Sequence, residues 1–342
     1  MFKNCLKVLL IIQLLTFNLW TIKPNSLNFP VPFLSKNQQI MNDYHQWNRF
    51  YGTDYYFHGG LDLQTHENAS VIAPSDGRIF CGYYNIKHFS SGHYKVVRNE
   101  KMYGGNVEKY FEIILVTKEN FIIEMHHVNP KSISNQCKKW NTGDGLNVKK
   151  GQVIGKVVNW DYKTLDNTYY HHIHLNVISP TGERLNPRYF FKKITDVEAP
   201  TIENVWTNLA SNRYQVLHSR EVSLITDEIL VQAVDKVGAG VNPPVRWKIY
   251  QNGKLVFSRD FSKRKKYFKI KNVFATRFYT NDGKFINEYS VRNQKTFYLR
   301  IPIKINKACE LLIEVEDYAK NKSTLKLFIL GRQAQIKYGI IY

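Results

Sequence analysis

Three short histidine-containing segments could together carry metal chemistry. In the first, His58-Gly59-Gly60-Leu61-Asp62, the two adjacent glycines disfavour a helix. If the segment is extended, His58 and Asp62 point to the same face, because residues four apart in a strand share a face. Histidine and aspartate are both good zinc ligands. Taken alone this spacing is a weak signal, since many loops hold one histidine and one aspartate.

The second segment, His171-His172-Ile173-His174-Leu175, is typical of a strand. His172 and His174 would then lie on one face, about 7 Å apart along the chain. The apolar residues that alternate with them would pack in a core from the other face. Two histidines on one face of a core strand suggest a chemical role. The competing interpretation is a polar strand face exposed to solvent.

The third segment, Met125-His126-His127-Val128, ends a predicted strand. Strict alternation places His127 on the same face as Met125, and His126 on the opposite face. His126 is therefore expected to be an ordinary surface residue that tolerates alanine. The competing interpretation of His127 is a satisfied polar residue without a chemical role.

Together the three segments provide a complete hydrolytic set. The predicted ligands of one zinc ion are His58, Asp62 and His174, which leave the metal a fourth position for water. Zinc lowers the pKa of such a water towards about 7 and polarises a scissile carbonyl. His127 and His172 remain to transfer protons and to stabilise developing charge, so they are the predicted catalytic residues.

With its flanking strand–turn units, the stretch from about residue 50 to 190 resembles the catalytic domain of lysostaphin- and LytM-type zinc endopeptidases. The units that match are Val71–Gly77 and Val148–Gly155, followed by Gly182 and Asn186-Pro187. The matched chemical positions are His58 and Asp62 in the family's H-x-x-x-D motif, His172 and His174 in its H-x-H motif, and His127 as its isolated catalytic histidine.

Near the predicted site the chain departs from the family pattern. Met125 stands where family members usually carry an aromatic residue, two positions before the isolated histidine. Asn176 and Val177 stand where Phe-Glu is common, and Tyr162–Tyr170 replaces a glycine-rich approach to the strand. None of these departures removes a ligand, so they bear on substrate preference more than on activity.

The resemblance implies a secreted zinc metalloendopeptidase that hydrolyses peptide bonds in peptidoglycan, at cross-bridge or stem-peptide positions. A second enzymatic interpretation is a peptidase for glycine-rich or other extracellular protein. The non-enzymatic alternative is a cell-wall-binding or hydrolase-activating protein that retains the peptidase fold. All five chemical positions are present, which argues against that alternative.

The first residues predict export. Lys3 and Lys7 give a positive start, and Val8–Trp20 is mostly apolar. That stretch is shorter than the roughly 20 residues needed to span a bilayer. Residues 1–24 are therefore a predicted signal peptide, with an uncleaved N-terminal anchor as the alternative. Either one places the protein in the periplasm, the cell envelope or the extracellular space.

The formal net charge of +20 favours polyanionic partners. The basic run Lys263–Lys266 would suit an anionic cell-wall polymer. The competing interpretation is a solvated edge strand whose lysines prevent aggregation, and a lysine-rich composition accounts for part of the charge. Peptidoglycan peptides are the predicted partners and anionic wall polymers are candidates; no nucleic-acid partner is predicted.

Four cysteines are present, and Cys5 falls in the predicted export segment. No Cys-x-x-Cys pair occurs, so a cysteine zinc site is excluded. Cys81 and Cys137 could form a disulfide in an exported protein, or could remain buried thiols.

Histidine placement divides the chain of 342 residues, because ten of its 11 histidines lie in the first 174 residues. Short β-rich runs continue to the C-terminus. We predict an all-β protein, with a lysostaphin-type antiparallel β catalytic domain over residues 25–197 and an Ig-like β-sandwich over residues 198–342. In the second domain Leu230–Asp235 resembles Leu312–Asp317. Without clustered histidines or cysteines, this domain is predicted to hold no metal.

Overall fold

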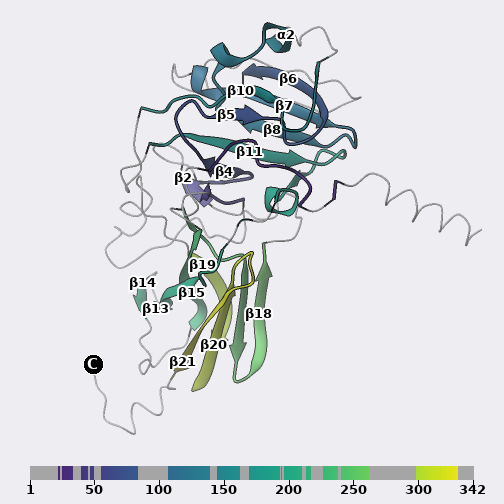
Figure 1. Ribbon diagram of the computed structural model, residues 1–342. Helices are drawn as coiled ribbons and strands as arrows, with labels where there is room; N and C mark the ends of the chain where they lie inside the picture. Colours follow the sequence, from purple (N-terminus) through teal and green to yellow (C-terminus); the bar gives the residue numbers. More distant parts are fainter. Residues whose placement is uncertain are drawn as a thin grey trace, which may run out of the picture.

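The structure is a computed structural model (Figure 1). It describes residues 22–23, 25–33, 40–44, 47–49, 55–83, 107–138, 145–161, 169–192, 194, 196–209, 213–216, 226–237, 240–261 and 298–329. The predicted export stretch Val8–Trp20 and the basic run Lys263–Lys266 lie outside these residues. In the part of the chain described, no helix has the length and apolar character needed to cross a membrane.

The described chain is built almost entirely from antiparallel strands, which confirms the predicted all-β class. Figure 1 shows two strand-rich bodies, one from the purple-to-teal part of the chain and one from the green-to-yellow part. The short helical elements are η2 (Val107–Tyr110), η3 (Pro130–Ser132), α2 (Asn135–Lys138) and η5 (Pro187–Tyr189).

The first body is organised around an eight-stranded sheet. The strand order is β1 (Ile40–Asn42), β4 (Leu61–Gln64), β11 (His172–Ile178), β8 (Ile122–His126), β7 (Phe111–Thr117), β6 (Gly77–Tyr83) and β9 (Leu146–Val148), with β12 (Arg184–Leu185) paired to β11. Two smaller pairs are β5 (Ser70–Ile72) with β10 (Val153–Lys156), and β2 (Trp47–Arg49) with β3 (Tyr55–Phe57).

Alternation along these strands separates a core face from a polar face. On β11, Ile173, Leu175 and Val177 are fully buried in the core of the first body, as predicted. Met125 of β8 joins the same core. The polar residues that alternate with these side chains lie on the other face of the sheet, where the candidate site is built.

A disulfide joins Cys81 of β6 to Cys137 of α2, so the disulfide alternative is the one present in the structure. Both residues lie in the core of the first body. Among the described residues the remaining cysteine, Cys309, is free and buried in the second body.

The second body consists of two sheets that share one apolar core. The first sheet contains β14 (Arg213–Val216), β13 (Thr201–Leu209), β15 (Thr226–Val237) and β16 (Gly240–Asn242), with β19 (Tyr298–Ile305) paired to β15. The second contains β18 (Lys254–Asp260), β17 (Arg246–Gln251), β20 (Cys309–Glu316) and β21 (Lys322–Ile329). The two similar sequence segments are strands, as predicted; an Ig-like topology stays a prediction.

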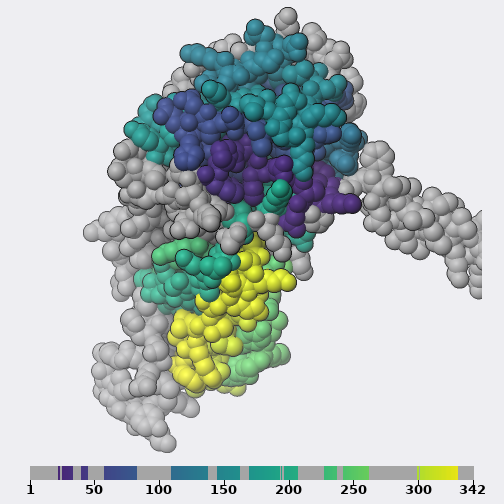
Figure 2. Space-filling model, in the orientation of Figure 1, coloured from purple at the N-terminus to yellow at the C-terminus, as the bar shows by residue number. Residues whose placement is uncertain are grey.

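The two bodies contact each other through polar and aromatic residues. Figure 2 shows the purple N-terminal residues on the side of the first body that faces the second. Tyr44 follows β1 but packs in the core of the second body. Arg188 donates to Asp43 at 2.9 Å, and its guanidinium lies 4.7 Å from the centre of the Tyr318 ring. Asn186 donates to the Tyr318 hydroxyl.

Candidate metal centre

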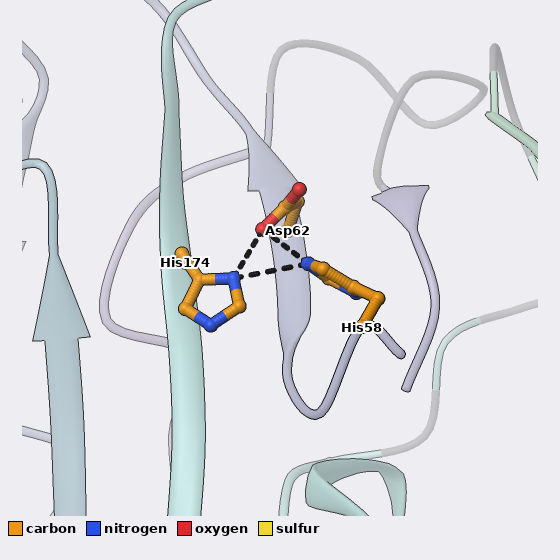
Figure 3. Close-up of side chains that lie close together, drawn as sticks. All are labelled: His58, Asp62 and His174. Atoms are coloured by element: carbon orange, nitrogen blue, oxygen red, sulfur yellow. Dashed lines mark hydrogen bonds and ion pairs between the residues drawn. The ribbon is translucent and has the colours of Figure 1, made fainter. Parts of the chain in front are cut away.

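Strand pairing brings the three predicted metal ligands together. Asp62 of β4 lies directly opposite His174 of β11 in the antiparallel register, and His58 is placed by the short turn before β4. Their facing atoms are close: His58 Nε2 lies 3.1 Å from Asp62 Oδ1 and 3.0 Å from His174 Nδ1, and His174 Nδ1 lies 2.7 Å from Asp62 Oδ1 (Figure 3).

This spacing fits a single small cation. In a tetrahedral zinc site with bonds of about 2.0–2.1 Å, neighbouring ligand atoms lie roughly 3.3 Å apart. The triangle formed by His58, Asp62 and His174 is only slightly tighter, at 2.7–3.1 Å. Two imidazoles and one carboxylate are also a usual donor set for zinc.

Hydrogen bonds select the imidazole tautomers that a metal needs. His58 Nδ1 lies 2.9 Å from the backbone carbonyl of Asp43, and His174 Nε2 lies 3.2 Å from Asn176 Oδ1. A carbonyl oxygen only accepts, so these two ring nitrogens carry the protons. The opposite nitrogens, His58 Nε2 and His174 Nδ1, therefore direct their lone pairs to the centre of the triangle.

The charge states also suit a metal. Burial raises the pKa of the Asp62 carboxyl, but His58 and His174 outweigh burial and hold that pKa well below its ordinary value. Burial lowers the pKa of His174 to about 4, although Asp62 acts in the opposite direction. Near neutral pH the site thus presents a carboxylate and a neutral imidazole. Asn42 donates to the outer oxygen of Asp62 and fixes its orientation.

His127 and His172, the predicted catalytic pair, lie together beside this triangle. Their ring centres are 4.6 Å apart. His127 Nδ1 donates to the Lys109 carbonyl at 2.7 Å, and His172 Nδ1 donates to the Tyr170 carbonyl at 2.8 Å. Both Nε2 atoms are therefore unprotonated in the neutral ring and able to accept a proton.

One aromatic side chain, that of Trp160, packs against both histidines of this pair. The Trp160 ring stacks on His172, with centres 5.5 Å apart, and meets His127 edge-on at 5.0 Å. Burial lowers the pKa of His127 well below its ordinary value, and the neighbouring His172 lowers it further. Burial also lowers the pKa of His172, although Asp62 opposes the shift. Both histidines are accordingly neutral bases near pH 7.

The predicted placement of His126 is wrong. His126 is 3% exposed and lies opposite His174 in the register of β8 with β11, so it belongs to the site face. His127 follows the last residue of β8 and has a left-handed backbone, with φ of 67°. Alternation does not apply beyond the last residue of a strand. The turn that follows β8 therefore directs the His127 side chain to the site as well.

One row of polar residues crosses five strands of the sheet. The register pairs Asn42 with Asp62, Asp62 with His174, His174 with His126, and His126 with Glu112. The predicted ligands Asp62 and His174 therefore lie within a continuous polar row, and are not isolated on an apolar sheet.

Beneath the predicted ligands, a network of buried polar side chains supports this row. His126 Nδ1 lies 3.3 Å from Glu112 Oε2, and His126 Nε2 lies 3.3 Å from Glu124 Oε2. Asn176 donates to Glu124 at 2.7 Å while its own oxygen receives the proton of His174. Burial raises the pKa of Glu124, but His126 and Arg184 outweigh it and lower that pKa to about 2.

Sequence reasoning missed these supporting residues, although a usable signal existed for some of them. Asn176 follows His172 and His174 by the same two-residue step, and Glu124 precedes His126 by that step. Extending the alternation from His172 and His174 would have placed Asn176 on the site face, whereas on β8 it groups Glu124 with His126, which was predicted to lie on the surface. Asn42 had no comparable signal, because its strand is only three residues long.

Replacing His126 by alanine should destabilise the first body. The change leaves the carboxylates of Glu112 and Glu124 buried without their imidazole partner, and a buried polar group left unpaired costs about 1–3 kcal/mol, more when it is charged. Urea unfolding with a probe for the first body measures this loss. His66→Ala is the matched control, because His66 is exposed in the same body and its removal should leave the midpoint unchanged. Equal stability of the two variants would contradict the role assigned to the network.

Replacing Gly60 by alanine should weaken metal binding. An added Cβ would lie 2.6 Å from both Asn176 Oδ1 and His174 Cε1, and closer still to the Leu175 carbonyl. Contacts of this length force the predicted ligand His174 and its hydrogen-bond partner to move. We expect a 10- to 100-fold loss of metal affinity, the usual scale for disturbing a ligand's support. A competition titration with a zinc-binding dye measures it; unchanged affinity in a folded variant would contradict the tight packing.

Comparisons with known proteins give similarity only to solved structures, since no family model and no curated protein matches the chain. Helicobacter pylori Csd3 is similar at 19% identity and a TM-score of 0.29, over 52% of this chain and 36% of that chain. A zinc-containing peptidase from Vibrio cholerae is similar at 15% identity and a TM-score of 0.31, over 50% of this chain and 41% of that one.

The antimicrobial peptidase lysostaphin from Staphylococcus simulans is also similar, at 11% identity and a TM-score of 0.27. That match covers 89% of this chain and 91% of lysostaphin. By contrast, the chain spans well under half the length of the Helicobacter and Vibrio proteins. At these identities and TM-scores the case for function rests on the site itself.

Proposed function

We propose that the chain is an exported zinc metalloendopeptidase that hydrolyses peptide bonds in peptidoglycan. The observation that carries the proposal is the convergence of His58, Asp62 and His174, whose facing atoms lie 2.7–3.1 Å apart. Two further histidines, His127 and His172, lie beside this triangle, each with its Nδ1 held by a backbone carbonyl.

His58, Asp62 and His174 would hold the zinc ion. Zinc bound there supplies Lewis acidity, which polarises a peptide carbonyl and makes water more acidic. Each ligand is itself held: His58 by the Asp43 carbonyl, His174 by Asn176, and Asp62 by Asn42. Such support keeps the ligands in place before metal and substrate arrive.

His127 and His172 would transfer the protons of the reaction. Hydrolysis of an amide takes a proton from the attacking water and delivers one to the leaving nitrogen. Each ring is oriented by a backbone carbonyl at its Nδ1, so Nε2 is the atom that accepts or returns the proton. When protonated, either ring can also stabilise negative charge on the former carbonyl oxygen.

The substrate class and the location come from other observations. Peptidoglycan is proposed because the motifs of residues 50–190 resemble those of lysostaphin-type peptidases in kind and order. Export is proposed from the basic and then apolar N-terminal sequence. The disulfide between Cys81 and Cys137 supports an oxidising compartment, where such bonds persist.

Digestion of purified peptidoglycan from several bacterial sources tests the function. The full chain should release soluble fragments whose masses and new amino termini identify the bond that was cut. A chelator should abolish release, and zinc alone should restore it. Binding to the wall without release by the zinc-loaded protein would instead favour the non-enzymatic alternative, a wall-binding or hydrolase-activating protein.

A further inference from the structure

A second group of acidic side chains lies at the junction of the two bodies. Asp196 belongs to the segment that joins them, Asp235 lies in β15, and Asp317 directly follows β20. One carboxylate oxygen from each residue lies within 4.8 Å of the other two. Asp235 and Asp317 are the final residues of the two similar sequence segments, so this resemblance ends where the side chains converge.

Burial makes this crowding of negative charge unfavourable. Asp235 is 2% exposed and Asp317 is fully buried, while Asp196 is half-buried. Burial raises the pKa of Asp235 to about 8, with Asp196 and Asp317 acting in the same direction. Arg188 opposes this shift but is already paired with Asp43 at 2.9 Å. The single guanidinium of Arg188 thus lies among four carboxylates, those of Asp43, Asp196, Asp235 and Asp317.

Asn242 gives a second, independent observation. It lies in β16 opposite Asp235 in the antiparallel register, so the two side chains leave the sheet on the same face. Asn242 is fully buried, and neither its amide oxygen nor its amide nitrogen has a hydrogen-bond partner in the described structure. The same is true of Asp235 Oδ1. Buried polar groups are nearly always paired, so these oxygens point to a ligand that takes up their lone pairs.

We propose that Asp196, Asp235, Asp317 and the amide oxygen of Asn242 bind a hard divalent cation, with calcium as the best match. All four donors are oxygens, which calcium and magnesium prefer, and no imidazole or thiolate selects zinc. Calcium takes six to eight oxygens in irregular geometry, which suits donors from separate segments completed by water and backbone carbonyls.

The bound cation would fasten the two bodies together. Asn321 donates to both oxygens of Asp317, at 2.8 Å and 2.7 Å, and to the backbone carbonyl of Asp196 at 3.2 Å. The linker and the turn after β20 are therefore already in contact. The cation would connect β15 to both of them through Asp235. The expectation of no metal in the second domain considered only histidines and cysteines, so it could not anticipate carboxylate donors.

Calcium titration of the full chain tests the proposal. The protein is stripped of metal, reloaded with one equivalent of zinc, and titrated by calorimetry with calcium chloride or magnesium chloride. We expect one calcium per chain, unchanged zinc content, and a Tm rise of about 5–10 °C at 100 times the Kd. No binding of either cation would overturn the site, and tighter binding of magnesium would overturn the choice of calcium.

Substitutions locate the binding. Asp235→Asn should abolish calcium binding, yet in chelator its Tm should equal or exceed that of the wild type because one buried like charge is removed. Asp227→Asn is the matched control, since Asp227 is exposed on the same strand and should bind calcium normally. If Asp235→Asn does not fold, the half-buried Asp196→Asn replaces it. Normal calcium binding by either cluster variant, or its loss in Asp227→Asn, would overturn the assignment.

Discussion

Replacing His172 or His127 by alanine should leave zinc in place and reduce turnover by a factor of about 10² or more. That factor is the usual scale for losing a proton-transfer group or an oxyanion stabiliser. Zinc should stay because the three proposed ligands are His58, Asp62 and His174, none of which is changed. Zinc content by mass spectrometry and peptide cleavage rates, measured on the same samples, test this separation.

His66→Ala is again the control, because this exposed histidine should change neither zinc content nor rate. The double variant adds a further test. His127 and His172 are close enough to serve the same step, with ring centres 4.6 Å apart, so their losses should not multiply. A double variant slowed by the full product of the single effects would mean that the two histidines act independently. Wild-type turnover in either single variant would refute its catalytic role.

The proposed ligands could be picked out from the sequence because strand alternation is a local rule and because their motifs match those of a known family in kind and order. His172 and His174 are two residues apart on β11, and Asp62 faces His174 across a single strand pair. The same rule failed at the end of β8, where His127 adopts a left-handed backbone that no alternation describes. A residue that follows a strand takes its direction from the turn, and the turn depends on tertiary contacts.

The contribution of residues 42–44 could not be predicted from the sequence. Asn42 donates to Asp62, the Asp43 carbonyl accepts from His58, and Tyr44 packs in the core of the second body. The Asp43 carboxylate also receives the guanidinium of Arg188. Three consecutive residues thus connect the candidate metal centre to the junction of the bodies. These contacts join segments far apart in the chain, and the three-residue strand has no periodicity that would reveal them.

Replacing His174 by alanine should remove both zinc and activity. The change leaves only His58 and Asp62, and two protein ligands do not make a catalytic zinc site. In the wild type, zinc at 100 times its Kd should stabilise the folded state by about 2.7 kcal/mol, because the unfolded chain lacks the assembled site. His174→Ala should lose this zinc-dependent rise in Tm, whereas His172→Ala should keep it.

Thermal unfolding is measured with and without zinc, and zinc content is measured on the same samples. Together the two measurements distinguish the proposed ligand His174 from the proposed proton carrier His172 on the same strand. The metal-free proteins provide the baseline, since a merely structural loss would lower the Tm of His174→Ala equally in both conditions. If His172→Ala loses zinc while His174→Ala keeps it, the two roles must be exchanged. That result would conflict with the geometry, because His174 Nδ1 lies 2.7 Å from Asp62 Oδ1, whereas His172 directs its Nδ1 to the Tyr170 carbonyl and packs against Trp160.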